Sequence, residues 1–263
     1  VEANRQGGGP HGEVPYYGMT APGAGAAMAW RIYLDRYGAD PAKLGAIPVA
    51  FRRHARLNPQ AIMQKPLTLE DYLRSPYVIE PLRLPDFCLM NDGGACLILT
   101  SAERARDCRK PPVFIKGFQG LRAGREEFIF ARPGLGAWQQ SVSEAGDEDQ
   151  PVYRMAGLDR SDIGALYVYD AFSPLVVFTL ERFGFAPPGE GLDWVQGGRV
   201  ELGGELPVNT NGGLLSEAHI SGWNHLVELV RQLRGECGDR QVRDLKYDQW
   251  ATCFGDSVIF GRE

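Results

Sequence analysis

The sequence has few of the residues that build metal sites, disulfide scaffolds or cofactor-binding loops. It contains four histidines and five cysteines, and no two cysteines form a C-x-x-C pair. An odd number of cysteines without paired spacing argues against a disulfide framework and a structural zinc site, so we expect reduced thiols. H-E-x-x-H spacing, a P-loop and a G-x-G-x-x-G segment after a strand are all absent, so we predict neither a metal nor a dinucleotide cofactor.

An excess of basic residues and long apolar runs are also missing. The 28 Lys and Arg are outnumbered by 33 Asp and Glu, which gives a net charge of −5. This balance argues against nucleic-acid binding, because such proteins usually carry a basic excess. The apolar runs are far shorter than the roughly 20 residues of a membrane helix. The N-terminus shows no signal-peptide pattern, and we therefore expect a cytoplasmic protein.

Glycine, in contrast, is abundant, with 33 residues in a chain of 263. Seven glycines lie in residues 1–25 and ten in residues 184–222. The second stretch contains the pair Gly212–Gly213, which leads to His219. The excess therefore marks loops around a candidate site.

Strand and helix patterns alternate along the chain, which predicts an α/β layered fold. The predicted helices cover residues 24–37, 40–57 with a bend near Pro48, 68–73, 102–108, 152–158, 172–183 and 222–234. The predicted strands cover residues 95–100, 113–118, 165–169 and two segments within 245–260, joined by a turn at 254–256.

Tyr169 and Asp170 follow a predicted strand and precede a helix. Ligands of α/β sheets bind at the carboxyl ends of strands. A phenol there can donate or relay a proton. The alternative is that Asp170 only caps the helix and Tyr169 only packs.

His219 is the second candidate. The glycine pair before it allows a close approach of the backbone, and the N-terminus of a following helix offers unpaired N–H groups. A histidine at this place can meet a developing anion, or it can simply cap the helix. We expect His225 to be structural, and His54, which lies beside arginines, to be solvated or at an interface.

Cys253 lies in the turn between the last two strands. Its thiol could move a proton if an electropositive setting lowered its pKa. The alternative is a buried inert cysteine, which we expect for the other four.

These segments resemble, in order, the motifs of the C-terminal part of the thiolase superfamily. The similarity is greatest to the branch that contains sterol carrier protein X and the bacterial steroid side-chain aldolases. The matching segments are 92–95 (D-G-A-A in the family), 169–172 (N-E-A-F or H-D-C-F), 209–219 (N-x-x-G-G-x-x-x-x-x-H), 232–235 (Q-L-R-G) and 253–255 (C-x-G).

The resemblance implies a thiolase-like αβαβα sandwich that dimerises and acts on acyl-CoA thioesters. Residues 1–85 would form a loop or cap region with the remainder of the N-terminal half. Residues 86–263 would hold the last strand or strands of that half and the C-terminal domain. The N-terminal half would then be incomplete in this chain, without the segment of the thiolase nucleophile. The resemblance also implies substrate contacts from Asp170, Asn209, Gly212 and Gly213.

The departures from the thiolase pattern favour a different reaction. Tyr169 replaces the family's Asn or His, and G-H-P is here Ala218-His219-Ile220. These changes resemble the aldolases, which cleave a β-hydroxyacyl-CoA, here of a steroid side chain, to a short acyl-CoA and a ketone or aldehyde. Tyr169 and His219 would be the acid and the base, in an order left open, with Cys253 as a third catalytic residue.

Two other functions remain open at this point. One is an acetyl-CoA acyltransferase whose nucleophile lies in the missing half, and the other is a non-catalytic acyl-CoA-binding subunit. The resemblance implies a homodimer, a small partner with an OB-fold and a zinc ribbon, and a bacterial cytoplasmic setting. It implies acyl-CoA as substrate and no resident cofactor.

Overall fold

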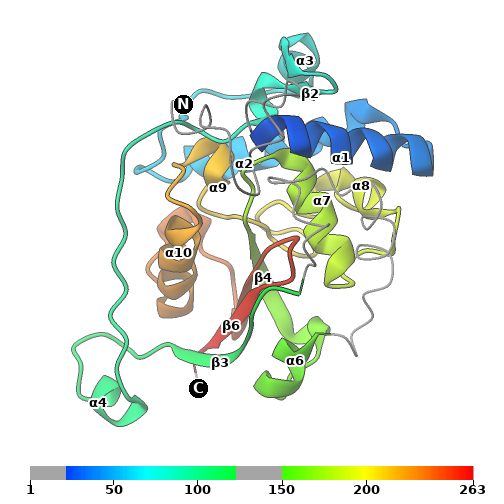
Figure 1. Cartoon of the computed structure of the whole chain (residues 1–263). Helices are drawn as coiled ribbons and strands as arrows, with labels where there is room; N and C mark the ends of the chain where they lie inside the picture. The colour runs from blue at the N-terminus through cyan, green and yellow to red at the C-terminus, as the bar shows by residue number, and fades with distance from the viewer. Residues whose placement is uncertain (1–21, 123–149, 263) are drawn as a thin grey trace, which may run out of the picture.

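A four-stranded mixed sheet lies at the centre of the computed structural model, which describes residues 22–122 and 150–262 (Figure 1). The strand order is β3-β6-β5-β4. β4 runs parallel to β5, whereas β6 runs antiparallel to both β5 and β3. The bounds are β3 Phe114–Gln119, β4 Ile163–Val168, β5 Tyr247–Ala251 and β6 Ser257–Gly261.

The side chains of β4 point alternately to the two faces of the sheet, and each face is covered by a different helix. Ala165 and Tyr167 pack with Leu229 and other residues of α10 (Trp223–Arg234). The intervening Leu166 and Val168 belong to the larger core on the other face, together with α7 (Ser173–Arg182). Successive side chains of a strand point to opposite faces. The α/β class predicted from the sequence is therefore confirmed, with helices on both sides of the sheet.

The N-terminal helices complete the larger core. The ring of Trp30 in α1 (Pro22–Tyr37) lies 5.9 Å from the ring of Phe178, and the Tyr33 hydroxyl donates to Glu181 Oε1 at 2.6 Å. The described part of residues 22–85 is thus largely helical and shares a core with the C-terminal part of the chain. Whether a domain boundary lies near residue 85 stays a prediction.

The second helix differs from its prediction in one respect. Asp40 caps the 3-10 helix η3 (Pro41–Gly45), which passes directly into α2 (Ala46–Arg56). The change of helix type occurs before Ala46, and α2 continues through Pro48, where the predicted bend stays a prediction. Pro48 is the third residue of α2, where the backbone N–H has no partner within the helix, so a proline does not disturb it.

Short elements connect these parts. Thr68 caps α3 through a capping box, with Asp71 as the reciprocal partner. The short elements are α3 Leu69–Arg74, β1 Tyr77–Ile79, β2 Leu82–Arg83, η4 Leu84–Asp86, α4 Ala102–Arg106, α6 Pro151–Ala156, η7 Arg160–Asp162, α8 Gly191–Trp194, η8 Gln196–Gly198, α9 Gly213–Ser216 and η9 Gly238–Arg240.

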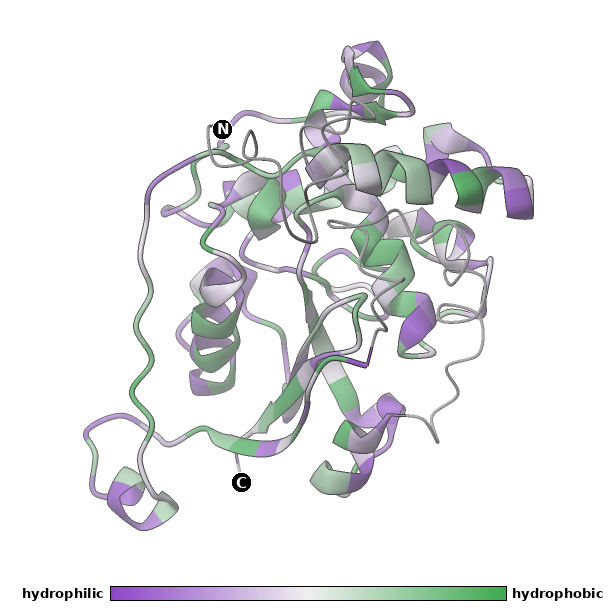
Figure 2. Ribbon diagram, in the orientation of Figure 1, coloured by the Kyte–Doolittle hydropathy of each residue, from purple (hydrophilic) through white to green (hydrophobic). Residues whose placement is uncertain are grey.

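The strand predicted over residues 95–100 is wrong. This segment runs extended along the outside of the molecule toward α4 and pairs with no strand among the described residues (Figure 1). Its apolar character, visible in Figure 2, stays exposed, with 91% of Ile98 and 71% of Leu99 accessible. An apolar run makes a strand only when another backbone supplies the hydrogen bonds. Among the described helices, none is long and apolar enough to span a membrane.

Candidate active site

The structure brings Tyr169 and His219 together, although 50 residues separate them. Tyr169 directly follows β4, and His219 lies in the loop between α9 and α10. The Tyr169 hydroxyl lies 3.4 Å from His219 Nε2, and both side chains are half-buried. Such a long contact is usual for catalytic groups without substrate. The pair therefore offers two proton-transferring groups at the carboxyl end of a strand.

Burial keeps the Tyr169 hydroxyl protonated and the His219 imidazole unprotonated near neutral pH. Desolvation, reinforced by the nearby Cys88, raises the pKa of Tyr169 to about 12. Desolvation also lowers the pKa of His219 from its usual 6.5, although the charge of Asp170 opposes this shift. Near pH 7 Tyr169 is therefore a proton donor, and His219 an unprotonated imidazole that can accept a proton.

The backbone around His219 is held from two sides. The His219 N–H donates to Asn91 Oδ1 at 2.8 Å, and Asn224 Nδ2 donates to the Ala218 carbonyl at 3.0 Å. Asn91 directly precedes the 92–95 motif, and Asn224 is the second residue of α10. Both contacts join segments that are distant in the sequence or belong to different elements. Sequence reasoning therefore missed them, and the only signal was the run of amide side chains near the histidine.

Asp170, predicted to bind substrate, lies beneath the pair and is completely buried. Its Oδ1 accepts from the Leu214 N–H at 2.9 Å and contacts His225 Nε2 at 3.0 Å, and its Oδ2 accepts from the Leu215 N–H at 3.4 Å. The carboxylate thus links the end of β4 to α9 and α10. A direct contact of Asp170 with substrate stays a prediction.

His225 continues this chain of contacts and, as expected from the sequence, has a structural setting. It is completely buried, and its Nδ1 lies 3.2 Å from Asn211 Nδ2. The same Asn211 amide donates to Glu217 Oε2. The network extends from Asp170 to Glu217, beside the loop that carries His219.

The two glycines have distinct reasons to be glycine. Gly212 has φ +109° and Gly213 has φ +69°, in the region that side chains disfavour. A Cβ atom on Gly213 would collide with the Asp170 carboxylate, and one on Gly212 would lie 2.7 Å from the Ala55 Cβ. The N–H groups that follow are not open to a ligand, because those of Leu214 and Leu215 already donate to Asp170. The helix expected to follow His219 is α10, so an anion contact at its N-terminus stays a prediction, as do substrate contacts by the two glycines.

Asn209 has φ +49° and is completely buried. Its side chain accepts from the Val168 N–H at 2.8 Å and donates to the Val168 carbonyl at 3.0 Å, as a neighbouring strand would. The side chain thus holds the 209–213 turn against the end of β4. The predicted substrate contact of Asn209 stays a prediction.

Cys253 lies in the turn after β5 and is 2% exposed. Burial raises the pKa of its thiol to about 12, so the thiol is protonated near neutral pH. A thiolate at Cys253 would raise the pKa of Tyr169, so the two side chains lie near each other. All five cysteines lie within the described residues, and none forms a disulfide. The expectation that the other four are buried holds for Cys237 but is wrong for Cys96 and Cys108, which are exposed, and for Cys88, which is partly exposed.

His54 is buried, and the prediction of a solvated or interface side chain is wrong. It is 2% exposed, its Nδ1 lies 3.1 Å from the Asn209 carbonyl, and its Nε2 accepts from the Leu202 N–H at 2.9 Å. Burial lowers its pKa to about 4. The arginines beside His54 in the sequence do not indicate whether His54 itself is exposed, because adjacent residues of a helix can lie on its buried and its exposed face.

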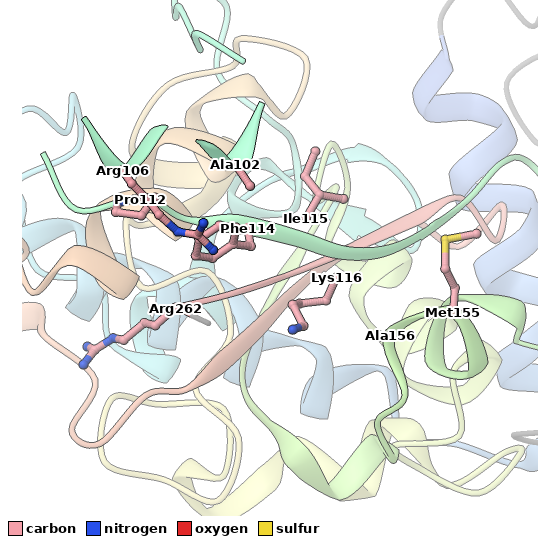
Figure 3. A pocket seen from close by; sticks show the side chains of 9 residues that line it. All are labelled: Ala102, Arg106, Pro112, Phe114, Ile115, Lys116, Met155, Ala156 and Arg262. Atoms are coloured by element: carbon pink, nitrogen blue, oxygen red, sulfur yellow. The ribbon is translucent and has the colours of Figure 1, made fainter. Parts of the chain in front are cut away.

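Two hollows lie outside the Tyr169–His219 contact. One of about 400 Å³ adjoins the His219 loop and is lined by Gly94, Ala95, Cys96, Leu97, Ile220 and Trp223. Another of about 730 Å³ lies between α4, β3 and α6, and Figure 3 shows Arg106, Lys116 and Arg262 reaching it from different segments. Within the described residues, no three His, Cys, Asp or Glu side chains gather as metal ligands would.

Comparisons with known proteins identify the family. A family model described as thiolase C-terminal domain-like matches residues 131–251. The steroid side-chain-cleaving aldolase of Thermomonospora curvata is 41% identical over 225 residues, which cover 83% of this chain and 56% of the relative. The 17-hydroxy-3-oxo-4-pregnene-20-carboxyl-CoA lyase of Mycobacterium tuberculosis is 40% identical over 222 residues, with the same two coverages.

A solved structure, an Ltp2-ChsH2(DUF35) aldolase, matches with a TM-score of 0.88 and 37% identity. The match covers 98% of this chain and 68% of that one. The chain spans about half the length of the curated relatives it matches. The chain belongs to the thiolase superfamily, in its branch of steroid side-chain-cleaving aldolases.

Proposed function

We propose that this chain carries the acid and the base of a retro-aldolase that cleaves a β-hydroxyacyl-CoA thioester of a steroid side chain. The products are a short acyl-CoA and a ketone or aldehyde. The observation that carries the proposal is the contact of 3.4 Å between the Tyr169 hydroxyl and His219 Nε2. The names of the matched relatives, an aldolase and a CoA lyase, support it.

The reaction begins with removal of the proton from the β-hydroxyl. His219 is the base, because its lowered pKa leaves the imidazole unprotonated near pH 7. As the O–H bond breaks, the carbonyl forms and the Cα–Cβ bond breaks. The electron pair of that bond passes to the thioester as an enolate, and the proton stays on His219.

Tyr169 completes the reaction by protonating the enolate at Cα. Its pKa of about 12 keeps the phenol protonated until the enolate forms. The phenolate then recovers a proton from the His219 imidazolium across their mutual contact. The cycle is balanced, since the proton taken from the β-hydroxyl ends in the acyl-CoA product and both residues return to their starting states. No cysteine nucleophile is needed.

Cys253 takes a subordinate place in this proposal. Its thiol is protonated near neutral pH because burial raises its pKa to about 12. It can therefore act as a neutral neighbour or proton donor near Tyr169, but not as a standing thiolate nucleophile. We keep it as a catalytic candidate on these terms.

The assembly is proposed on the same basis. The matched structure bears the name of an Ltp2-ChsH2(DUF35) aldolase, which supports a small acyl-CoA-binding partner for this chain as well. We also propose a homodimer of the thiolase-like subunit, a bacterial cytoplasmic location and no resident cofactor beside the acyl-CoA substrate.

The test is product formation by the full-length protein with its partner on a steroid β-hydroxyacyl-CoA. Tyr169→Phe and His219→Ala should each lower kcat by about 10²- to 10⁴-fold, because each removes a proton-transferring group. Tyr37→Phe, on the exposed end of α1, is the matched control and should leave the rate unchanged. Cleavage that persists in both site variants would refute the proposal.

Two other outcomes would identify the alternatives. Thiolysis of a β-ketoacyl-CoA by free CoA, without aldol cleavage, would identify an acyltransferase. Binding of acyl-CoA without turnover, and unaffected by His219→Ala, would identify a non-catalytic binding subunit.

A further inference from the structure

We propose that Asp170 and His225 are positioning residues, which hold the loop of residues 217–222 so that His219 stays opposite Tyr169. This inference rests on the proposed function in assigning His219 and Tyr169 to catalysis. It concerns two side chains that are completely buried.

The position of the loop depends on the two helices that flank it. α9 ends at Ser216 and α10 begins at Trp223, so only six residues connect them. The Asp170 carboxylate bonds to both helices, through the Leu214 and Leu215 N–H groups of α9 and through His225 of α10. Because Asp170 follows Tyr169 directly, the same carboxylate fixes the position of both helices relative to the Tyr169 side chain.

The hydrogen bonds of His225 determine its tautomer. Asn211 Oδ1 accepts from the Gly213 N–H at 3.3 Å, which orients the Asn211 amide so that its Nδ2 faces His225 Nδ1. An amide nitrogen only donates, so Nδ1 accepts and the proton is on Nε2. His225 Nε2 then donates to Asp170 Oδ1 at 3.0 Å. The hydrogen bond between His225 of α10 and Asp170, which follows β4, therefore requires this one tautomer of His225.

Glu217 holds the start of the loop in a similar manner. Its carboxylate accepts from three amide side chains, Asn58 at 2.8 Å, Asn224 at 2.8 Å and Asn211. Asn211 donates to both His225 and Glu217, so the two ends of the loop share one side chain. Hydrogen bonds among buried polar groups restrict these side chains to one arrangement.

Asp170 also acts on His219 through its charge. Desolvation lowers the pKa of His219, the Asp170 carboxylate opposes that shift and His225 adds to it, while Tyr169 is in contact. Removal of the Asp170 charge should therefore lower the pKa of His219 further. A purely structural support would not change this titration.

The decisive measurement is NMR titration of the His219 imidazole in ¹⁵N-histidine-labelled protein. Asp170→Asn should shift the His219 midpoint to lower pH by about 0.5 unit or more. His225→Phe keeps a ring of similar volume but removes both hydrogen bonds, and should lower kcat by about 10- to 100-fold with little change in KM. His225→Gln retains a donor for Asp170 and an acceptor for Asn211, and should recover most of the rate.

Leu229→Ala, one turn further along the buried face of α10, is the matched control. It should lower the stability without changing the His219 titration or kcat. An unchanged His219 titration in Asp170→Asn, or a rate for His225→Phe equal to that of the control, would overturn the inference. A shifted titration in a protein without aldolase activity would refute the proposed function and leave the positioning role intact.

Discussion

Replacing Gly213 by alanine tests how closely the glycine loop and the Asp170 carboxylate depend on each other. Gly213 has φ +69°, and a Cβ atom there would lie 3.0 Å from the Asp170 Cγ and closer still to Oδ2. The left-handed conformation costs a non-glycine residue about 1–2 kcal/mol. The carboxylate must also move, which weakens hydrogen bonds to a charged group worth about 1.5–3 kcal/mol each. The expected loss of unfolding free energy is about 3–5 kcal/mol.

Gly235→Ala is the matched control for the backbone part of this loss. Gly235 ends α10 with φ +72°, and a Cβ atom there would meet no described atom within 4 Å. Its substitution should cost only the conformational strain, about 1–2 kcal/mol. The difference between the two variants, about 2–3 kcal/mol, is then the cost of displacing Asp170.

Urea unfolding followed by tryptophan fluorescence and circular dichroism measures both losses on the same protein. Equal losses in the two variants would refute the reasoning, because the carboxylate would then tolerate the methyl group without losing contacts. Gly213→Ala should also reduce turnover more than Gly235→Ala does, since only the former disturbs the residues beneath Tyr169 and His219.

Two further predictions concern pH and thiol chemistry. Burial lowers the pKa of His54 to about 4, so between pH 6.5 and 4 the unfolded chain binds a proton that the folded chain does not. Stability should therefore fall by about 3 kcal/mol more in the wild type than in His54→Gln as the pH drops through this window; parallel curves would contradict this. Cys96 and Cys108 are exposed and should react rapidly with Ellman's reagent, whereas buried Cys237 and Cys253 should react only on unfolding. Rapid labelling of Cys253 in the native protein would contradict its burial.

Many elements of the fold could be predicted from the sequence, because they depend on neighbouring residues. The capping box at Thr68 and the glycine that ends α10 at Gly235 are contacts within a few residues, and the helices predicted over 68–73 and 222–234 are confirmed. The order of the motifs also placed Tyr169 at the end of β4 and His219 in the glycine-rich segment. The sequence thus indicated the family and both residues of the pair, but it left their distance unknown.

The tertiary structure decided what depends on distant residues. Residues 95–100 have the apolar pattern of a strand, yet they lack a partner among the described residues, and periodicity cannot supply one. His54 stands among arginines in the sequence but faces Asn209 across the fold. Asp170 bonds to residues 44 to 55 positions away. Capping and periodicity arise from local geometry, whereas burial, pKa shifts and sheet pairing arise from whichever groups the fold brings near.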